Sequence, residues 1–223
     1  MLRIFFWKIG FEWANLRRAV FPAKNRKVYY FAFGANLSKE VLKRRKIEVF
    51  ETFDHQLDGA CLQFTQTGFY KGHGYASADP EPGNVTYGKM YSILESDARR
   101  MDYYEGVPFL DVHEKVTCDE RDFSFYYYRA MKPEDDLKPT QEYLDYITSA
   151  YRDMPMVPRD YLESLKRNPV LEEMLPRDST GDFVRNIHGW PAFLHPLLVR
   201  YESICHSVVE FFWNRSLVAW MIK

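Results

Sequence analysis

The sequence predicts an α+β domain, in which a small sheet is accompanied by helices. The first observation is an aromatic strand followed by a tight turn and a helix near residue 30. The second is two helices that begin near Pro139 and Pro158, where a missing N–H costs nothing. The third is a series of strand-like runs rich in β-branched and aromatic residues. These runs are residues 28–33, 48–54, 59–65, 72–78, 85–93, 112–118 and 123–130.

Composition limits the class of protein. The chain has 223 residues, 46% of them hydrophobic, which fits one domain with appendages. A formal net charge of −1 gives no electrostatic support for binding nucleic acid. Three separated cysteines, Cys61, Cys118 and Cys205, argue against a disulfide framework and for a reducing compartment, which we take to be the cytoplasm. We expect no membrane-spanning helix, because no stretch of eighteen residues is both apolar and uncharged.

The chain is organised around the stretch from Val28 to Ser38. The strand ends at Gly34-Ala35-Asn36, residues that suit a turn and a close backbone approach. Ser38 is a helix N-cap candidate, and helix formers follow at residues 39–46. Such a turn leaves backbone N–H groups without partners at the positive end of a helix, which indicates an anion site. We interpret the basic run within residues 43–46 as a solvated helix face.

A second stretch places a carboxylate at a helix end. Ser96 or Asp97 caps a short helix that runs through Tyr104, so Glu105 lies at its C-terminus and Gly106 follows. The negative end of the helix dipole and the neighbouring tyrosine rings both disfavour the carboxylate charge. We therefore expect the pKa of Glu105 to be raised, toward that of a useful base. The alternative is an ordinary solvated glutamate.

Together, Phe33-Gly34-Ala35-Asn36-Leu37 and Glu105-Gly106-Val107 resemble the gamma-glutamylcyclotransferase family. Its members open with a Tyr-Gly-Ser-Asn-Leu loop after a strand and carry a catalytic Glu, then Gly, then a hydrophobic residue. A helix entered at Pro139 and the spacing Tyr161-x-x-x-Leu165 in the next helix also resemble the family. So does the passage of residues 72–93, in which we predict a turn at 79–84. The resemblance covers roughly residues 28–168.

The resemblance implies a small mixed, barrel-like sheet surrounded by helices, and an enzyme that needs no cofactor. Its members cleave a γ-glutamyl amide by attack of the α-amine on the γ-carbonyl, which gives 5-oxoproline and a released amino acid or amine. Glu105 would be the acid and base. Substrate would be bound by the loop and two tyrosines, which are Tyr30, Phe31, Ala32, Phe33, Gly34, Ala35, Asn36, Tyr128 and Tyr143. Phe33 and Ala35 depart from the family's Tyr and Ser, which leaves the choice of substrate open, and the run 126–128 allows a slip in the position matched by Tyr128.

The two ends of the chain have no counterpart in the family. Residues 1–27 are predicted to form an N-terminal amphipathic helix with its tail, and residues 169–223 a linker and a C-terminal amphipathic helix. We expect them to pack together, to form a homodimer contact or to make a peripheral membrane contact. The six histidines are scattered without helical pairing, so we expect no metal site.

Two other functions stay open. One is an enzyme of the same fold that acts on another amide, such as a γ-glutamyl-lysine isopeptide. The other is a non-catalytic binding or membrane-associated module.

Overall fold

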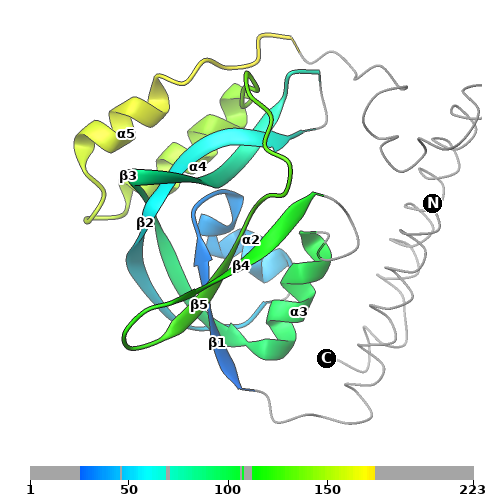
Figure 1. Cartoon of the computed structure of the whole chain (residues 1–223), viewed down its shortest axis with the longest axis vertical. Coiled ribbons are helices and arrows are strands. Elements are labelled where there is room, and N and C mark those ends of the chain that lie inside the picture. Colours follow the sequence, from blue (N-terminus) through cyan, green and yellow to red (C-terminus); the bar gives the residue numbers. More distant parts are fainter. Residues whose placement is uncertain (1–25, 46, 69–70, 106, 108–111, 174–223) are drawn as a thin grey trace, which may run out of the picture. The chain divides into compact units, whose positions relative to one another are not determined.

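The computed structural model describes residues 26–45, 47–68, 71–105, 107 and 112–173 (Figure 1). The two predicted terminal helices and Gly106 lie outside the described residues. The domain boundaries proposed from the sequence, at residues 27 and 168, therefore stay predictions.

A five-stranded mixed sheet forms the centre of the fold, in the order β2-β3-β1-β5-β4 (Figure 1). The central strand pairs antiparallel with β3 and parallel with β5. The predicted mixed sheet is thus confirmed, and the turn after β1 lies at the end of the middle strand. The strands are β1 Lys27–Ala32, β2 Val49–Thr67, β3 Gly74–Leu94, β4 His113–Asp119 and β5 Ser124–Ala130.

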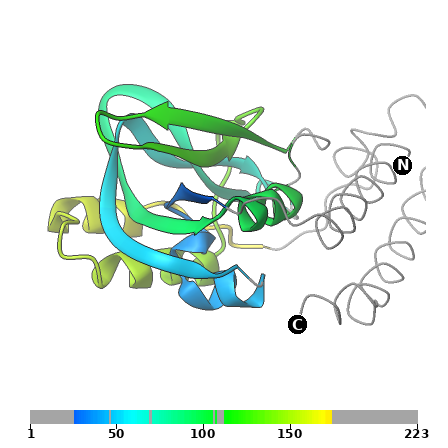
Figure 2. The ribbon, with the colours of Figure 1, turned by 90° about the horizontal axis from the view of Figure 1, so that it is seen from below.

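The β2–β3 hairpin differs from the prediction. The sequence indicated four short strands, but residues 49–67 and 74–94 are two continuous strands, so the turn predicted at 79–84 is wrong. The register moves from Ala60↔Pro80 to Asp58↔Val85, and Gly83 in the extra residues has a φ of 88°. The turn-forming residues are thus absorbed as an irregularity within a long ladder. Figure 2 shows how strongly this ribbon bends.

The helices lie close to the predicted positions, but α3 already begins at Glu95, so the prediction that Ser96 or Asp97 caps it is wrong and both residues lie inside its first turn. Thr140 caps α4, since its hydroxyl accepts the N–H of Tyr143 at 3.2 Å. Ser38 occupies the N-cap of α2, but its hydroxyl donates to Glu40 at 2.6 Å instead of accepting a backbone N–H. No helix among the described residues is long and apolar enough to cross a membrane. The helices are the 3₁₀ turn η1 Ala35–Leu37, α2 Lys39–Arg44, α3 Glu95–Tyr104, α4 Gln141–Arg152 and α5 Arg159–Lys166.

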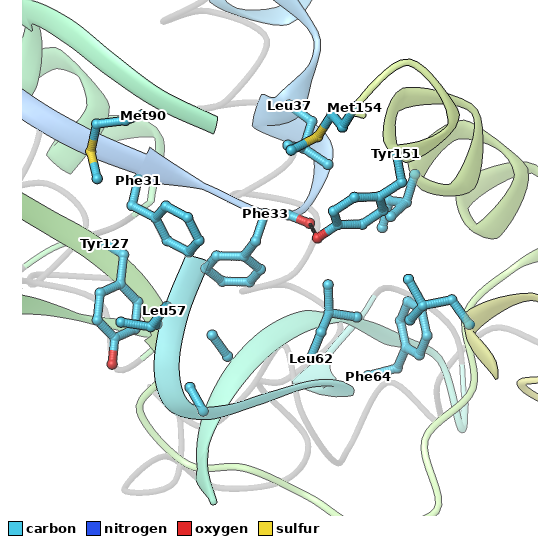
Figure 3. Close-up of a cluster of buried hydrophobic side chains, with 14 of the residues drawn as sticks. Phe31, Phe33, Leu37, Leu57, Leu62, Phe64, Met90, Tyr127, Tyr151 and Met154 are labelled. Atoms are coloured by element: carbon cyan, nitrogen blue, oxygen red, sulfur yellow. Dashed lines mark hydrogen bonds between the residues drawn. The ribbon is translucent and has the colours of Figure 1, made fainter. Parts of the chain in front are cut away.

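The alternation of side chains along β1 divides the core into two clusters. Tyr30 and Ala32 pack with residues of α2 and α3, whereas Phe31 and Phe33 pack with residues of β2, β5 and α4. Figure 3 shows Phe31 and Phe33 among Leu57, Met90 and Tyr127. Burying a phenylalanine contributes roughly 1.5–3 kcal/mol, so both faces of β1 hold the strand in place. The end of β1, and with it the Gly34 turn, is therefore fixed from two sides.

Candidate active site

The turn after β1 leaves little space for a side chain at Gly34. Gly34 has a φ of −114°, so the positive φ that glycine permits is not used. A Cβ atom at this position would lie 3.4 Å from the Tyr143 hydroxyl and 3.3 Å from the Ala76 Cβ. The close approach of α4 and β3 to the backbone therefore favours a residue without a side chain here.

The carbonyl groups of this turn are held by tyrosines from other elements. The Phe33 carbonyl accepts from Tyr151 at 2.8 Å, as the dashed line in Figure 3 shows. The Ala35 carbonyl accepts from Tyr146 at 3.2 Å, and the Leu37 carbonyl from Tyr91 at 2.7 Å. The chain's own Leu37 N–H donates to the Gly34 carbonyl at 3.0 Å.

The N–H groups of the turn are less fully used. Within the described part of the chain, no hydrogen bond joins the N–H of Gly34 or Asn36 to another group. The N–H of Ala35 interacts with the Tyr143 hydroxyl. A turn with occupied carbonyls and open N–H groups prefers an anion or a carbonyl oxygen as ligand. The anion site expected from the sequence stays a prediction, with the N–H groups of Gly34 and Asn36 as its candidate donors.

Tyr143 comes from the first turn of α4 and reaches the Gly34 turn. Its hydroxyl accepts the Ala76 N–H at 3.3 Å. Burial raises the pKa of Tyr143, with a smaller contribution from the charge of Glu105. The phenol therefore stays protonated at neutral pH and can donate a hydrogen bond.

Glu105 follows directly on α3. Its N–H donates to the Met101 carbonyl at 2.9 Å, and the Val107 N–H donates to the Asp102 carbonyl at 2.8 Å. The predicted position at a helix C-terminus is confirmed. Its side chain is only 12% exposed, so Glu105 is not an ordinary solvated glutamate.

Three side chains surround the Glu105 carboxylate. Arg45 donates from Nη1 to Oε1 at 2.6 Å, and Asn36 donates from Nδ2 to the same oxygen at 3.2 Å. His113 places Nδ1 3.5 Å from Oε2 and 3.0 Å from the Glu105 carbonyl oxygen. Because Asn36 belongs to the Gly34 turn, the two stretches singled out in the sequence meet at this carboxylate.

The expectation of a raised pKa for Glu105 is wrong. Burial does raise it, and this is the largest single influence. The charges of His113 and Arg45, with the hydrogen bonds from Arg45 and Asn36, together outweigh burial and lower the pKa below its usual value. Glu105 is therefore a carboxylate at neutral pH.

Three tyrosines lie beneath this carboxylate. The Tyr30 hydroxyl accepts from Asn36 at 2.7 Å, and its ring stacks on Tyr126 with centroids 5.2 Å apart. Tyr128 lies on the same face as Tyr126 but donates its hydroxyl to Asp102 at 2.6 Å. Tyr30 thus belongs to the Glu105 cluster, whereas the Tyr128 hydroxyl is already used.

The sequence-predicted residues other than Tyr128 therefore divide into three groups. Glu105, Asn36 and Tyr30 form one hydrogen-bonded cluster, and Gly34 and Ala35 meet Tyr143. The other side chains from the predicted segment point into the core, and these are Phe31, Ala32 and Phe33.

Sequence reasoning missed two partners of the carboxylate. Arg45 was interpreted as part of a solvated basic face, yet its side chain is only 23% exposed. Leu42, fully buried and three residues earlier, marks the inward face of α2 and could have indicated it. His113 begins β4 and carries no local signal.

Other groups do not add to the site. Two surface clefts of about 470 and 330 Å³ open elsewhere, and neither is lined by Glu105, Asn36 or Arg45. The carboxylate cluster stays the candidate site because it gathers the groups that can transfer protons, which neither cleft contains in this arrangement. The residues that adjoin Glu105 in the chain, 106 and 108–111, lie outside the described structure. Among the residues described, no group of three or more His, Cys, Asp or Glu could hold a metal ion.

Comparison with solved structures identifies the fold. A structure described as gamma-glutamyl cyclotransferase superposes with a TM-score of 0.56 at 19% identity, covering 66% of this chain and 91% of that one. An uncharacterized human protein gives 0.55 at 20% identity, with coverages of 66% and 90%. YkqA from Bacillus subtilis gives 0.51 at 19% identity, with coverages of 69% and 57%. No protein-family model and no curated protein sequence matches the chain. The central part of this chain has the gamma-glutamylcyclotransferase fold.

Proposed function

We propose that this protein is a gamma-glutamylcyclotransferase-type enzyme that releases 5-oxoproline from a γ-glutamyl amino acid or amine. The observation that carries the proposal is the contact between Asn36 and Glu105, 69 residues apart in sequence and 3.2 Å apart in space. It joins a turn with open N–H groups to a buried carboxylate. The shared fold supports the proposal at the level of architecture alone.

The reaction needs little more than positioning and proton transfer. The α-amine forms a bond to its own γ-carbonyl carbon, and the amide C–N bond breaks. Two protons must leave the α-ammonium to give the lactam N–H, and one must reach the departing nitrogen. Glu105 would take one of the two and deliver it to the departing nitrogen, and the other is released to solvent. Because the nucleophile belongs to the same molecule as the carbonyl, holding it in an attacking conformation removes much of the entropic barrier.

The turn and Tyr143 supply hydrogen-bond donors for such a substrate. The N–H groups of Gly34 and Asn36 remain open, and the Tyr143 hydroxyl is protonated. Replacement of the family Ser by Ala35 leaves these backbone donors intact. Phe33 points into the apolar core, so its missing hydroxyl removes nothing from the open side of the turn.

The test is release of 5-oxoproline from a panel of γ-glutamyl dipeptides, γ-glutamyl amines and γ-glutamyl-ε-lysine. Wild type is compared with Glu105→Gln, which keeps the shape of the side chain but cannot accept the proton. Glu114→Gln is the matched control, because Glu114 is a glutamate of β4 paired with Arg129 outside the cluster. We expect turnover in wild type and control and its loss in Glu105→Gln. Equal turnover in all three proteins would refute the role of Glu105.

One observation favours a second candidate, a non-catalytic binding module. Oε1 of Glu105 already accepts from Arg45 and Asn36, and the charges of His113 and Arg45 lower the pKa of the carboxyl group. A protein with this function would bind γ-glutamyl compounds without converting any of them. Saturable binding in a titration, with no 5-oxoproline from any member of the panel, would select this alternative.

A further inference from the structure

Arg45 is placed to do more than neutralise Glu105. It follows α2, and its guanidinium lies over the Tyr104 ring, 4.8 Å from the centroid. Only Nη1 is engaged, by Glu105 at 2.6 Å and by the Met101 sulfur at 3.9 Å. Among the described residues, no hydrogen bond is formed by Nη2 or Nε. A guanidinium presents its donors in pairs that match a carboxylate, so Arg45 keeps the capacity to bind a second one.

The charge balance of the site makes a second anion necessary. A substrate that gives its α-ammonium to Glu105 brings a second positive charge to a carboxylate that Arg45 already neutralises, so the ammonium and Arg45 share one negative charge. Arg45 is 23% exposed, and a mostly buried cation that loses its partner is strongly destabilised. A ligand that brings a carboxylate together with the ammonium removes this cost. The two charged groups of an α-amino acid are attached to one carbon, as close to each other as Arg45 is to Glu105.

Asn36 supplies an independent sign of an ammonium ligand. Its Nδ2 donates to Tyr30 at 2.7 Å and to Glu105 at 3.2 Å. Its Oδ1 is buried and has no hydrogen-bond partner in the described structure. A buried acceptor without a partner costs roughly 1–3 kcal/mol. An ammonium bound at Glu105 has the N–H group that this oxygen lacks.

We propose that the Arg45–Glu105 ion pair is the receptor for the α-amino-acid head group of the ligand, with the ammonium on Glu105 and Asn36 and the carboxylate on Arg45. The inference rests on the proposed function for the identity of the ligand, a γ-glutamyl compound. It assigns the α-carboxylate to Arg45 rather than to the N–H groups of the Gly34 turn. The ion pair opens on binding, and each partner exchanges one opposite charge for another.

The test compares ligands that differ only in the α-carboxylate. L-Glutamate and 4-aminobutanoate, which have no amide to cleave, are titrated into the full-length protein by NMR. In parallel, glycine release is measured from γ-glutamylglycine and 4-aminobutanoylglycine, both of which can cyclise to a five-membered lactam. The proteins are wild type, Arg45→Met, Arg45→Lys and the control Lys43→Met, which removes an exposed charge from the same helix.

We expect wild type and the Lys43 variant to bind L-glutamate at least tenfold more tightly than 4-aminobutanoate. Arg45→Met should abolish this discrimination, and Arg45→Lys, which keeps the charge, should retain part of it. The Lys variant keeps the test valid if the Met variant is unfolded by circular dichroism. Discrimination that survives in Arg45→Met, or is lost only when Lys43 is changed, would overturn the inference.

The two readouts separate this inference from the proposed function. Glycine release with the same preference in wild type and in both Arg45 variants would leave the enzyme proposal standing and refute the role of Arg45. Arg45-dependent binding of L-glutamate without any glycine release would support the role of Arg45 and refute the enzyme proposal. Absence of binding and of turnover in wild type would overturn both.

Discussion

Replacement of Arg45 by Met tests whether the ion pair decides the properties of Glu105. The change removes a guanidinium 2.6 Å from a carboxylate that is 12% exposed. Removing one partner of a buried ion pair costs roughly 3–5 kcal/mol, because the other charge stays buried. Asn36 and His113 still contact Glu105, and Arg45 is itself 23% exposed. We therefore expect the lower end of this range, about 3 kcal/mol of unfolding free energy at pH 7.

The cost should depend on pH in a defined direction. In wild type the pKa of Glu105 is lowered from 4.5, so its stabilising contribution is complete above pH 4.5 and is lost as the pH falls through the folded-state value. Arg45→Met removes two of the influences that lower this pKa, while burial continues to raise it. The carboxylate then takes up its proton at higher pH than in wild type. The difference in stability between the two proteins should shrink as the pH falls from 7 toward 4.

Urea unfolding at pH 7 and pH 4 measures both quantities. Arg129→Met is the matched control, because the Arg129–Glu114 pair is 25% and 41% exposed. Such a pair contributes roughly 0–1 kcal/mol. Glu105→Gln combined with Arg45→Met should recover most of the loss, since no buried charge remains. A cost for Arg45→Met no larger than that of the control, or one that is the same at both pH values, would refute the reasoning.

Three further outcomes follow from the site. In the pH profile of kcat/KM, the acid limb that reports Glu105 should lie below pH 4.5 and should move to higher pH in Arg45→Met. An acid limb that stays at the same pH in this variant would exclude Glu105 as the titrating base. Gly34→Ala puts a Cβ 3.4 Å from the Tyr143 hydroxyl, so KM for a γ-glutamyl substrate should rise about tenfold or less with the fold retained by circular dichroism. Tyr128→Phe removes the 2.6 Å hydrogen bond to the Asp102 carboxylate, so thermal unfolding should show a loss of roughly 1.5–3 kcal/mol in unfolding free energy. The value of kcat should stay within about twofold of wild type, and a large loss of kcat would place Tyr128 in the site.

Local signals explain which elements could be predicted. The turn after β1, the end of α3 and the start of α4 each depend on a few neighbouring residues that cap or break a helix. The β2–β3 hairpin depends on pairing between residues far apart. Pro80 and Gly83 are strong turn signals, but the long ladder with β2 overrides them, and the extra residues are accommodated inside it.

The site shows the same division between local and distant effects. The helix dipole, which suggested a raised pKa for Glu105, is worth about 0.3–1 kcal/mol at a helix end. The charges of His113 and of the Arg45 guanidinium outweigh it, and no pattern in one sequence indicates that Arg45 points to residue 105. His113 is equally distant from any motif. The identity of the carboxylate could therefore be predicted from the resemblance, whereas its ionisation required the fold.

The tyrosines around the Gly34 turn explain how the turn keeps its shape without the family's two side chains. The carbonyl groups of Phe33 and Ala35 accept hydrogen bonds from tyrosines of α4. The Gly34 carbonyl accepts from the Leu37 N–H of the turn itself. Tyr91 holds the next element in the same way through the Leu37 carbonyl. Backbone groups that are paired on one edge leave the opposite edge, with its N–H groups, to meet a ligand. Because this arrangement depends on the main chain, neither Phe33 nor Ala35 should decide whether an oxygen ligand is bound there, and of the two only Ala35, outside the core, should alter which substrate fits.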